Sequence, residues 1–258
     1  MAKVAVEKEG PLTIVSIDRF AEARNAVDPE TAILLREAFL AFDKEEGQSV
    51  AILTGRGGTF CAGFDLKVAA TRSAGAIHDP AGPGPMGPTR HLLSKPVIAA
   101  VEGYAVAGGL ELALWCDLRV ASATAKFGVF CRRWGVPLID GGTVRLPRLI
   151  GQSRALDMIL TGREVGAEEA YAWGLANRLA PAGQALEEAK ALATVLAKFP
   201  QTCMRSDRQS SYEQWGMDVR AALTNEGRLG MPALEAESQK GAARFAAGKG
   251  RGGGFGDI

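Results

Sequence analysis

A single carboxylate stands inside an apolar stretch of the chain. Glu111 lies in residues 105–117, which read AVAGGLELALWCD, three residues after Gly108. Moving a carboxylate from water into apolar surroundings costs several kcal/mol unless the group is paired or protonated. Glu111 is therefore either a structural acid held by a buried partner or an acid retained for proton transfer, and its spacing alone leaves both interpretations open.

Two glycine-containing turns follow apolar segments that are typical of buried strands. Residues 60–67, FCAGFDLK, come after the run SVAILTG at 49–55, and AVAGGLE comes after PVIAAV at 96–101. Parallel strands of one sheet end at the same edge, so we expect both turns to lie together at the carboxyl edge of a parallel sheet.

The second turn leads into a helical pattern, which gives its backbone a positive electrostatic character. The first N–H groups of a helix lack internal acceptors, and the helix dipole adds positive potential at Gly108. An N–H from the other turn that converges on the same point would complete an oxyanion hole beside Glu111, one helical turn further on. The alternative is that Gly63, Gly108 and Gly109 only permit tight turns or close packing.

The motifs that would indicate a bound cofactor fail on their context. Residues 82–87, GPGPMG, match the dinucleotide pattern GxGxxG, but no strand precedes them and two prolines stand where free N–H groups are needed. The chain has two histidines, His78 and His91, and no ligand spacing typical of a metal site. We therefore expect neither a metal nor a redox cofactor.

The elements that must position these residues are predicted from periodicity. Residues 4–18 alternate around a Glu-Gly-Pro turn and predict a hairpin or two neighbouring strands. A helix is predicted after Asp28, an N-cap that Pro29 follows. We expect β-α-β-α order with a parallel sheet over the first two-thirds, helices from about residue 143 onward, and a long irregular loop over residues 71–90.

Composition excludes several classes of partner. The chain has 258 residues, with 30 Lys and Arg against 29 Asp and Glu, and no dense basic block that would indicate nucleic acid or a membrane surface. No apolar run reaches the ~18 residues of a membrane span. The four cysteines form no CxxC pair and the N-terminus lacks the apolar core of a signal peptide, so we expect free thiols and a cytoplasmic protein.

Five phrases, in order along almost the whole chain, resemble the crotonase, or enoyl-CoA hydratase/isomerase, superfamily. They are RNAVDPE at 24–30, FCAGFDL at 60–66, EGYAVAGGLELALWCD at 102–117, FGVFCRRWGVPLIDGGTVRLPRLIG at 127–151 and LTGREVGAEEAYAWGLANRL at 160–179. The resemblance implies an α/β, crotonase-like fold of repeated ββα units over residues 1–195 and a helical C-terminal trimerisation region over residues 196–258. It also implies a homotrimer or a hexamer made of two trimers.

The same resemblance implies an acyl-CoA thioester as substrate, with coenzyme A arriving as part of it. The backbone amides of Ala62 and Gly108 would hold the thioester carbonyl, and Glu111 matches the first catalytic glutamate of family hydratases. The substrate-binding positions that the resemblance implies are Arg24, Ala62, Gly63, Phe64, Asp65, Leu66, Gly108, Cys131, Trp134, Phe245 and Lys249. Phe245 and Lys249 resemble a C-terminal pair that reaches a CoA bound to the neighbouring subunit.

The chain departs from the hydratase pattern at one position. Family hydratases carry a second glutamate in a phrase like FGxPE, whereas this chain has FGVFC, with Cys131 at that place. A thiol is a poor replacement for a carboxylate that transfers a proton to carbon, and we interpret Cys131 as a pocket-lining residue. Asp140, in the same phrase, suits two roles that both stay open: an N-cap of the next helix and a second acid.

We therefore expect an acyl-CoA-processing lyase or isomerase of the crotonase type, first of all an enoyl-CoA hydratase. It would stabilise a thioester enolate in a backbone oxyanion hole, with Glu111 as the proton carrier and Asp140 as its helper. The alternative within the family is an enoyl-CoA isomerase or an acyl-CoA hydrolase that uses Glu111 alone. The alternative from another class is a CoA-binding protein without chemistry.

Overall fold

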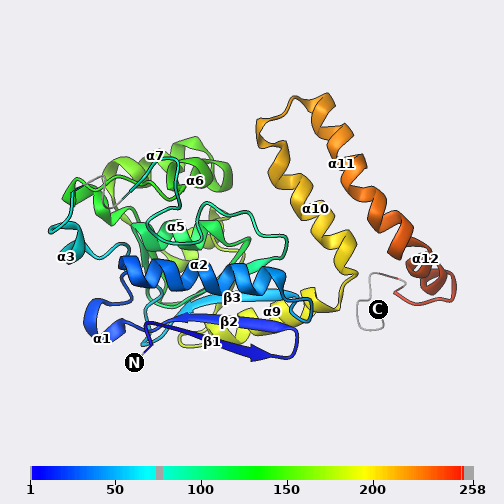
Figure 1. Cartoon of the computed structure of the whole chain (residues 1–258), viewed down its shortest axis with the longest axis horizontal. Helices are drawn as coiled ribbons and strands as arrows, with labels where there is room; N and C mark the ends of the chain where they lie inside the picture. The colour runs from blue at the N-terminus through cyan, green and yellow to red at the C-terminus, as the bar shows by residue number, and fades with distance from the viewer. Residues whose placement is uncertain (1, 74–77, 251, 253–258) are drawn as a thin grey trace.

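A six-stranded sheet forms the centre of the computed structural model, which describes residues 2–73, 78–250 and 252 (Figure 1). Its strand order is β1-β2-β3-β4-β6-β9, with β1 antiparallel to β2 and every other neighbouring pair parallel. A second sheet has the order β5-β7-β8. The strands are β1 (Val4–Glu9), β2 (Leu12–Ile17), β3 (Val50–Gly55), β4 (Val97–Val101), β5 (Tyr104–Val106), β6 (Leu118–Ser122), β7 (Lys126–Gly128), β8 (Glu164–Gly166) and β9 (Arg178–Ala180).

Helices connect and follow these strands. The α-helices are α1 (Phe20–Ala23), α2 (Pro29–Lys44), α3 (Leu66–Ala69), α5 (Gly108–Trp115), α6 (Gly142–Ile150), α7 (Gln152–Thr161), α8 (Ala167–Ala172), α9 (Ala185–Lys198), α10 (Gln201–Glu213), α11 (Val219–Ala233) and α12 (Gln239–Ala246). Two 3-10 helices, η1 (Phe130–Trp134) and η2 (Gln214–Gly216), and one π-helical turn, η3 (Leu234–Ser238), are the other helical segments of the described residues.

Both faces of the central sheet are covered, which explains why its inner strands are apolar throughout. All six residues of β2 and the first five of β3 are buried. Helices α2 and α5 share one hydrophobic cluster with one face of the sheet. On the other face, Ala185, Ala189 and Ala193 of α9 pack against Ile52 and Ile98. Small side chains four residues apart let α9 approach the strands closely.

The predicted N-terminal elements are confirmed. Strands β1 and β2 form an antiparallel hairpin, and β2, β3 and β4 are parallel neighbours. Helix α2 begins at Pro29, and Oδ1 of Asp28 accepts a hydrogen bond from the Thr31 N–H at 2.8 Å, as an N-cap does. Two strands followed by a helix recur in the orders β1-β2-α2 and β4-β5-α5.

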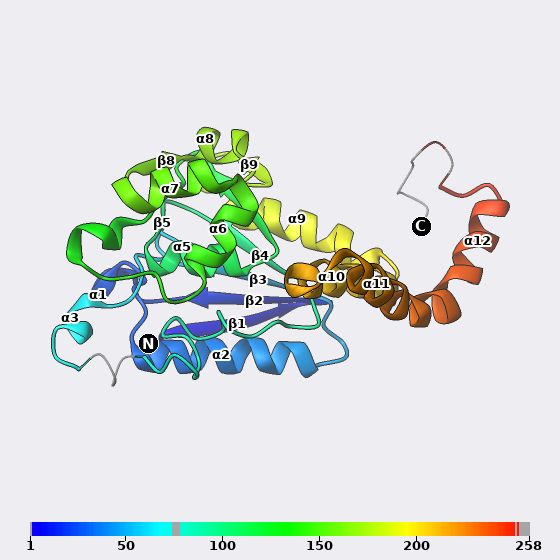
Figure 2. The ribbon, with the colours of Figure 1, turned by 90° about the horizontal axis from the view of Figure 1, so that it is seen from above.

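The C-terminal third is mostly helical, as predicted, with two exceptions. Strands β8 and β9 lie within it, and each has three residues, which is too short for the sequence to show alternation. Helices α10, α11 and α12 extend away from the layered part of the molecule as an arm (Figures 1 and 2). Within the described residues, no helix is long and apolar enough to cross a membrane.

Residues 74–77 of the predicted loop at 71–90 lie outside the described part of the chain. The described residues of the loop, 71–73 and 78–90, contain no helix or strand. Its second half is not a solvent-exposed segment. The side chains of Met86 and Thr89 are each 1% exposed, because residues 84–90 pack against the segment that precedes α6. This packing brings the loop to the site described next.

Candidate active site

A cavity of about 760 Å³ opens beside the N-terminus of α5. Its walls come from the two glycine-containing turns, the 3-10 helix η1, the segment that precedes α6, and part of the loop at 78–86. Nine of the residues predicted for the site line it: Arg24, Ala62, Phe64, Leu66, Gly108, Glu111, Cys131, Trp134 and Asp140. Sequence segments up to 116 residues apart, from Arg24 to Asp140, therefore meet at one hollow.

The two glycine-containing turns lie side by side, as predicted. Cys61 pairs with Ala105 in a parallel bridge, and a Cβ added to Gly63 would lie 3.1 Å from the Gly108 nitrogen. Gly63 has φ +102°, a conformation that L side chains rarely adopt. A Cβ on Gly109 would overlap the Cys61 carbonyl oxygen. Close packing is thus a real role of Gly63 and Gly109, and it places the two turns in contact.

The backbone at the start of α5 is bent sharply into the cavity. Ala107, just before the helix, has φ +54° and ψ −124°, an unusual conformation for a residue with a Cβ. Gly108 is the first helical residue, and no hydrogen bond from its N–H is found within the described residues. The Ala62 N–H, in contrast, donates to the Arg24 carbonyl oxygen at 3.2 Å. One of the two predicted donors is free and the other is engaged in a long hydrogen bond.

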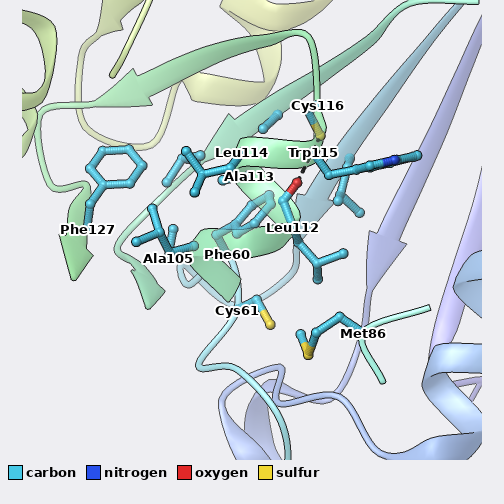
Figure 3. Packing of buried hydrophobic residues seen from close by; sticks show 14 of the residues in the cluster. Phe60, Cys61, Met86, Ala105, Leu112, Ala113, Leu114, Trp115, Cys116 and Phe127 are labelled. Carbon is cyan, nitrogen blue, oxygen red and sulfur yellow. Dashed lines mark hydrogen bonds between the residues drawn. The ribbon is translucent and has the colours of Figure 1, made fainter. Parts of the chain in front are cut away.

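The body of α5 is anchored in the core. Leu112, Ala113 and Leu114 pack among Phe60, Ala105 and Phe127 (Figure 3). The ring of Trp115 also meets that of Phe39, on α2, edge-on, with 4.8 Å between the ring centroids. Figure 3 also shows Cys61 and Met86 below the helix. Because α5 is held on several sides, Glu111 projects from a rigid element.

Glu111 is 2% exposed, and backbone donors hold one of its carboxylate oxygens. Its Oε1 accepts hydrogen bonds from the N–H groups of Asp140 at 2.9 Å and Gly142 at 2.8 Å. No hydrogen bond to Oε2 occurs among the described residues. Burial first, and then the neighbouring Asp140 carboxylate, raise the pKa of Glu111 to about 7 against the lowering effect of the two N–H donors. The group can therefore gain and lose a proton near neutral pH.

Asp140 lies in the same cavity and is also 2% exposed. It is not the N-cap of α6: that position belongs to Gly141, and no side chain caps the helix. The Oδ1 atom of Asp140 instead accepts hydrogen bonds from the Met86 N–H at 3.1 Å and the Thr89 hydroxyl at 2.5 Å. Burial raises the pKa of Asp140, and these two donors oppose the rise. The capping interpretation is wrong because the carboxylate points to the 84–90 loop.

Four of the predicted positions do not line this cavity. Gly63 lies behind it, and Asp65 pairs with Arg19 at 3.2 Å while its Oδ1 accepts from the Lys67 N–H at the start of α3. Phe245, on α12, and Lys249, just after it, are exposed at the end of the helical arm (Figure 2). Within one chain these two residues are absent from the cavity wall.

Cys131 contributes a neutral thiol to the wall. It is 6% exposed, and burial, followed by the charge of Glu111, raises its pKa. A thiol that keeps its proton is a weak nucleophile, which agrees with the prediction of a pocket-lining role. The four cysteines are all free, as predicted.

Several cavity residues were not predicted. Met86 and His78 come from the loop, Tyr104 from β5, Phe130 from η1 and Ile139 from the segment before α6. No local pattern marks them, because each reaches the cavity through contacts between segments far apart in the chain. Within the described residues, no group of three or more His, Cys, Asp or Glu side chains is placed to hold a metal ion.

Comparison with known proteins gives concordant results. The family model for enoyl-CoA hydratase/isomerase matches residues 7–250. Enoyl-CoA hydratase EchA19 of Mycobacterium tuberculosis is 36% identical over 249 residues, which are 93% of this chain and 92% of that protein. Carnitinyl-CoA dehydratase of Salmonella typhi is 40% identical over 192 residues, 73% of this chain and 72% of that protein.

Solved structures show the same similarity in three dimensions. The crystal structure of enoyl-CoA hydratase EchA1 from Mycobacterium marinum has a TM-score of 0.88 at 36% identity, and covers 95% of this chain and 96% of that chain. An enoyl-CoA hydratase subunit from Geobacillus kaustophilus also has a TM-score of 0.88, at 33% identity, with 95% of both chains covered.

Proposed function

Because this chain belongs to the enoyl-CoA hydratase/isomerase family and has its crotonase-like α/β fold, we propose that it adds water to the double bond of an enoyl-CoA thioester. The observation that carries the proposal is the pair of buried carboxylates, Glu111 and Asp140, in one cavity. Asp140 supplies the second carboxylate that Cys131 cannot.

Water addition needs one group that removes a proton from water and one that gives a proton to the carbon next to the thioester. Two close, buried carboxylates do not both ionise easily, so the pair holds one proton between them near neutral pH. The pKa of Glu111 is raised to about 7; burial also raises the pKa of Asp140, but the Met86 and Thr89 donors oppose that rise. We therefore assign the proton to Glu111 and the negative charge to Asp140.

The proposed step balances in protons and bonds. Asp140 takes a proton from water as the water oxygen bonds to C3, the C2–C3 π pair moves to form an enolate, and Glu111 gives its proton to C2. The pair then holds its single proton on Asp140, and exchange with solvent returns it to Glu111. The product is a 3-hydroxyacyl-CoA.

The developing enolate oxygen is stabilised by backbone donors. The free Gly108 N–H, at the positive end of α5, is the first donor. The Ala62 N–H is the second, and the thioester oxygen shares it with or takes it from the Arg24 carbonyl, whose hydrogen bond at 3.2 Å is long. Each such donor is worth ~3 kcal/mol of transition-state stabilisation in comparable sites.

We propose that the protein is a homotrimer or a hexamer of two trimers, and the helical arm supports this assembly. Large apolar side chains stand exposed on it, among them Val219, Leu223, Leu234 and Phe245. An apolar surface of this kind is usually covered by another protein surface. Light scattering at micromolar concentration should give a trimer or a hexamer, and a monomer would contradict this part of the proposal.

A mass-spectrometric screen of acyl-CoA thioesters tests the proposed reaction. Enoyl-CoAs of different acyl groups, and the matching 3-hydroxyacyl-CoAs for the reverse reaction, are incubated with and without the protein. Hydration appears as a gain of one water mass. Isomerisation leaves the mass unchanged and moves the double bond, hydrolysis releases free coenzyme A, and no turnover together with a CoA-dependent rise in Tm indicates a binding protein. Any of these three outcomes contradicts the hydratase proposal.

A further inference from the structure

Thr89 is a buried residue of the 84–90 loop whose hydroxyl has one hydrogen-bond partner within the described part of the chain. It is 1% exposed, and its Oγ1 lies 2.5 Å from Oδ1 of Asp140. A hydroxyl that donates to a carboxylate favours its ionised form. A threonine hydroxyl has one proton to donate, so in this geometry the proton of Thr89 is committed to Asp140.

The two cavity carboxylates are held in the same way, although by different elements. Each has one oxygen that accepts two hydrogen bonds: Oε1 of Glu111 from the backbone of Asp140 and Gly142, and Oδ1 of Asp140 from Met86 and Thr89. The second oxygen of each has no recorded hydrogen bond among the described residues. A carboxylate oxygen with both lone pairs occupied does not accept a proton readily, so proton exchange is directed to the other oxygen.

Arg145 joins the backbones of Thr89 and Asp140. Its Nη2 donates to the Thr89 carbonyl oxygen at 2.6 Å, and its Nη1 donates to the Asp140 carbonyl oxygen at 3.0 Å. One guanidinium therefore joins the backbones of both residues. The two backbones are held together at this point, and the Thr89 hydroxyl lies within hydrogen-bond distance of the Asp140 carboxylate.

We propose that Thr89 is a positioning residue for Asp140: its hydroxyl occupies Oδ1, favours the ionised carboxylate and leaves Oδ2 to exchange protons in the cavity. The proposal rests on the hydration proposed above, in which Asp140 acts as the base. Thr89 itself contacts neither the water nor the thioester. Its effect on the reaction passes through the carboxylate of Asp140.

Other charged groups face Asp140, and their contributions differ from that of Thr89. Glu111 lies beside it, and Arg90 and His78 act on it electrostatically from the loop. The Arg90 guanidinium donates to the Ile139 carbonyl oxygen at 3.1 Å, and Arg145 donates to the backbone. Thr89 is thus the one side chain recorded as a hydrogen-bond donor to the Asp140 carboxylate within residues 2–73, 78–250 and 252.

The test compares Thr89→Val with Thr89→Ser. Valine keeps the shape and removes the hydroxyl, while serine keeps the hydroxyl and removes a methyl group. We expect Thr89→Val to lower kcat/KM for the best enoyl-CoA by about 10- to 100-fold, the range of a hydrogen bond to a charged group. Without the donor, the pKa of Asp140 rises, so the acid limb of the pH profile moves to higher pH. Thr89→Ser should have a kcat/KM within about 3-fold of the wild type, and the acid limb of its pH profile should not move.

A second measurement does not depend on turnover. The carboxyl ¹³C signal of Asp140, in protein labelled at aspartate and assigned with Asp140→Asn, should titrate at higher pH in Thr89→Val than in the wild type and Thr89→Ser. Thr89→Ala takes the place of the valine variant if the latter does not fold. If the wild type turns over no thioester, the proposed function fails on its own and the titration alone decides the role of Thr89.

Two results would overturn the proposal. One is an unchanged pH profile and carboxyl titration in Thr89→Val. The other is an equal loss of rate in the valine and serine variants, because that pattern indicates packing of the loop and not the hydroxyl. Stabilisation by coenzyme A, measured as a shift in Tm, should be the same in all variants.

Discussion

The backbone N–H of Asp140 donates to Oε1 of Glu111 at 2.9 Å, while the Asp140 side chain enters the same cavity. The residue that holds one carboxylate therefore supplies the other. This arrangement places two acids together without a glutamate at position 131. It also keeps a negative charge next to Glu111, which adds to the effect of burial on the pKa of Glu111.

The raised pKa of Glu111 predicts a stability that falls as pH rises. Its folded-state pKa is about 7 against an ordinary value of 4.5, so the native protein binds this proton more tightly than the unfolded chain. The contribution is complete below pH 4.5 and is lost as pH rises through 7. Glu111→Gln removes this loss, and urea unfolding should show a gain over the wild type that is about 2 kcal/mol larger at pH 8 than at pH 5. A gain that does not change with pH would contradict the burial of an ionisable Glu111.

The backbone conformation of Ala107, at the edge of the site, predicts that a glycine there stabilises the protein. Its φ of +54° and ψ of −124° cost a residue with a Cβ about 1–3 kcal/mol, whereas glycine adopts them readily. Glycine also loses up to about 1 kcal/mol more conformational entropy on folding. Ala107→Gly should therefore raise the free energy of unfolding by about 1 kcal/mol. Ala105→Gly, in the neighbouring strand β5, is the control and should lower it.

Replacing Arg119, which does not line the cavity, should cause a large loss of stability. Its guanidinium is 1% exposed and donates to the carbonyl oxygens of Ala113, Cys116 and Leu175, so it satisfies the C-terminal end of α5. Arg119→Met leaves these acceptors unpaired and should lower the free energy of unfolding by about 3 kcal/mol. Arg119→Lys keeps the charge but not the planar guanidinium group, so its free energy of unfolding should lie between those of the wild type and Arg119→Met. Equal stability of the methionine variant would show that α5 does not depend on this contact.

Features of the fold and the site could be predicted from the sequence where the residues that form them are close together in the chain. Helix α2 was predictable because its cap and its apolar stripe lie within one continuous segment, and β2, β3 and β4 because each is a short apolar run between turns. The burial of Glu111 was predictable because its apolar neighbours in sequence are also its neighbours in space.

Other parts depend on contacts that no local pattern records. Thr89 meets Asp140 across 51 positions, so neither this hydrogen bond nor the burial of the 84–90 loop could be predicted. The same holds for the Ala62 N–H, whose hydrogen bond to Arg24 depends on how two loops meet. Asp140 is a residue type that suits a helix cap, but its carboxylate accepts hydrogen bonds from Met86 and Thr89 of the loop instead.

Hydration of an enoyl-CoA in H₂¹⁸O and D₂O, by the wild type and two carboxylate variants, tests the shared role of Glu111 and Asp140 most directly. The wild type should place one ¹⁸O on C3 and one deuterium on C2 of the product. Glu111→Gln and Asp140→Asn should each lower the rate of this incorporation by ~10²- to 10⁴-fold and still be stabilised by coenzyme A. Incorporation at the wild-type rate in Asp140→Asn would contradict the two-carboxylate mechanism, and the same result in Glu111→Gln would remove the buried carboxylate of AVAGGLELALWCD from the chemistry.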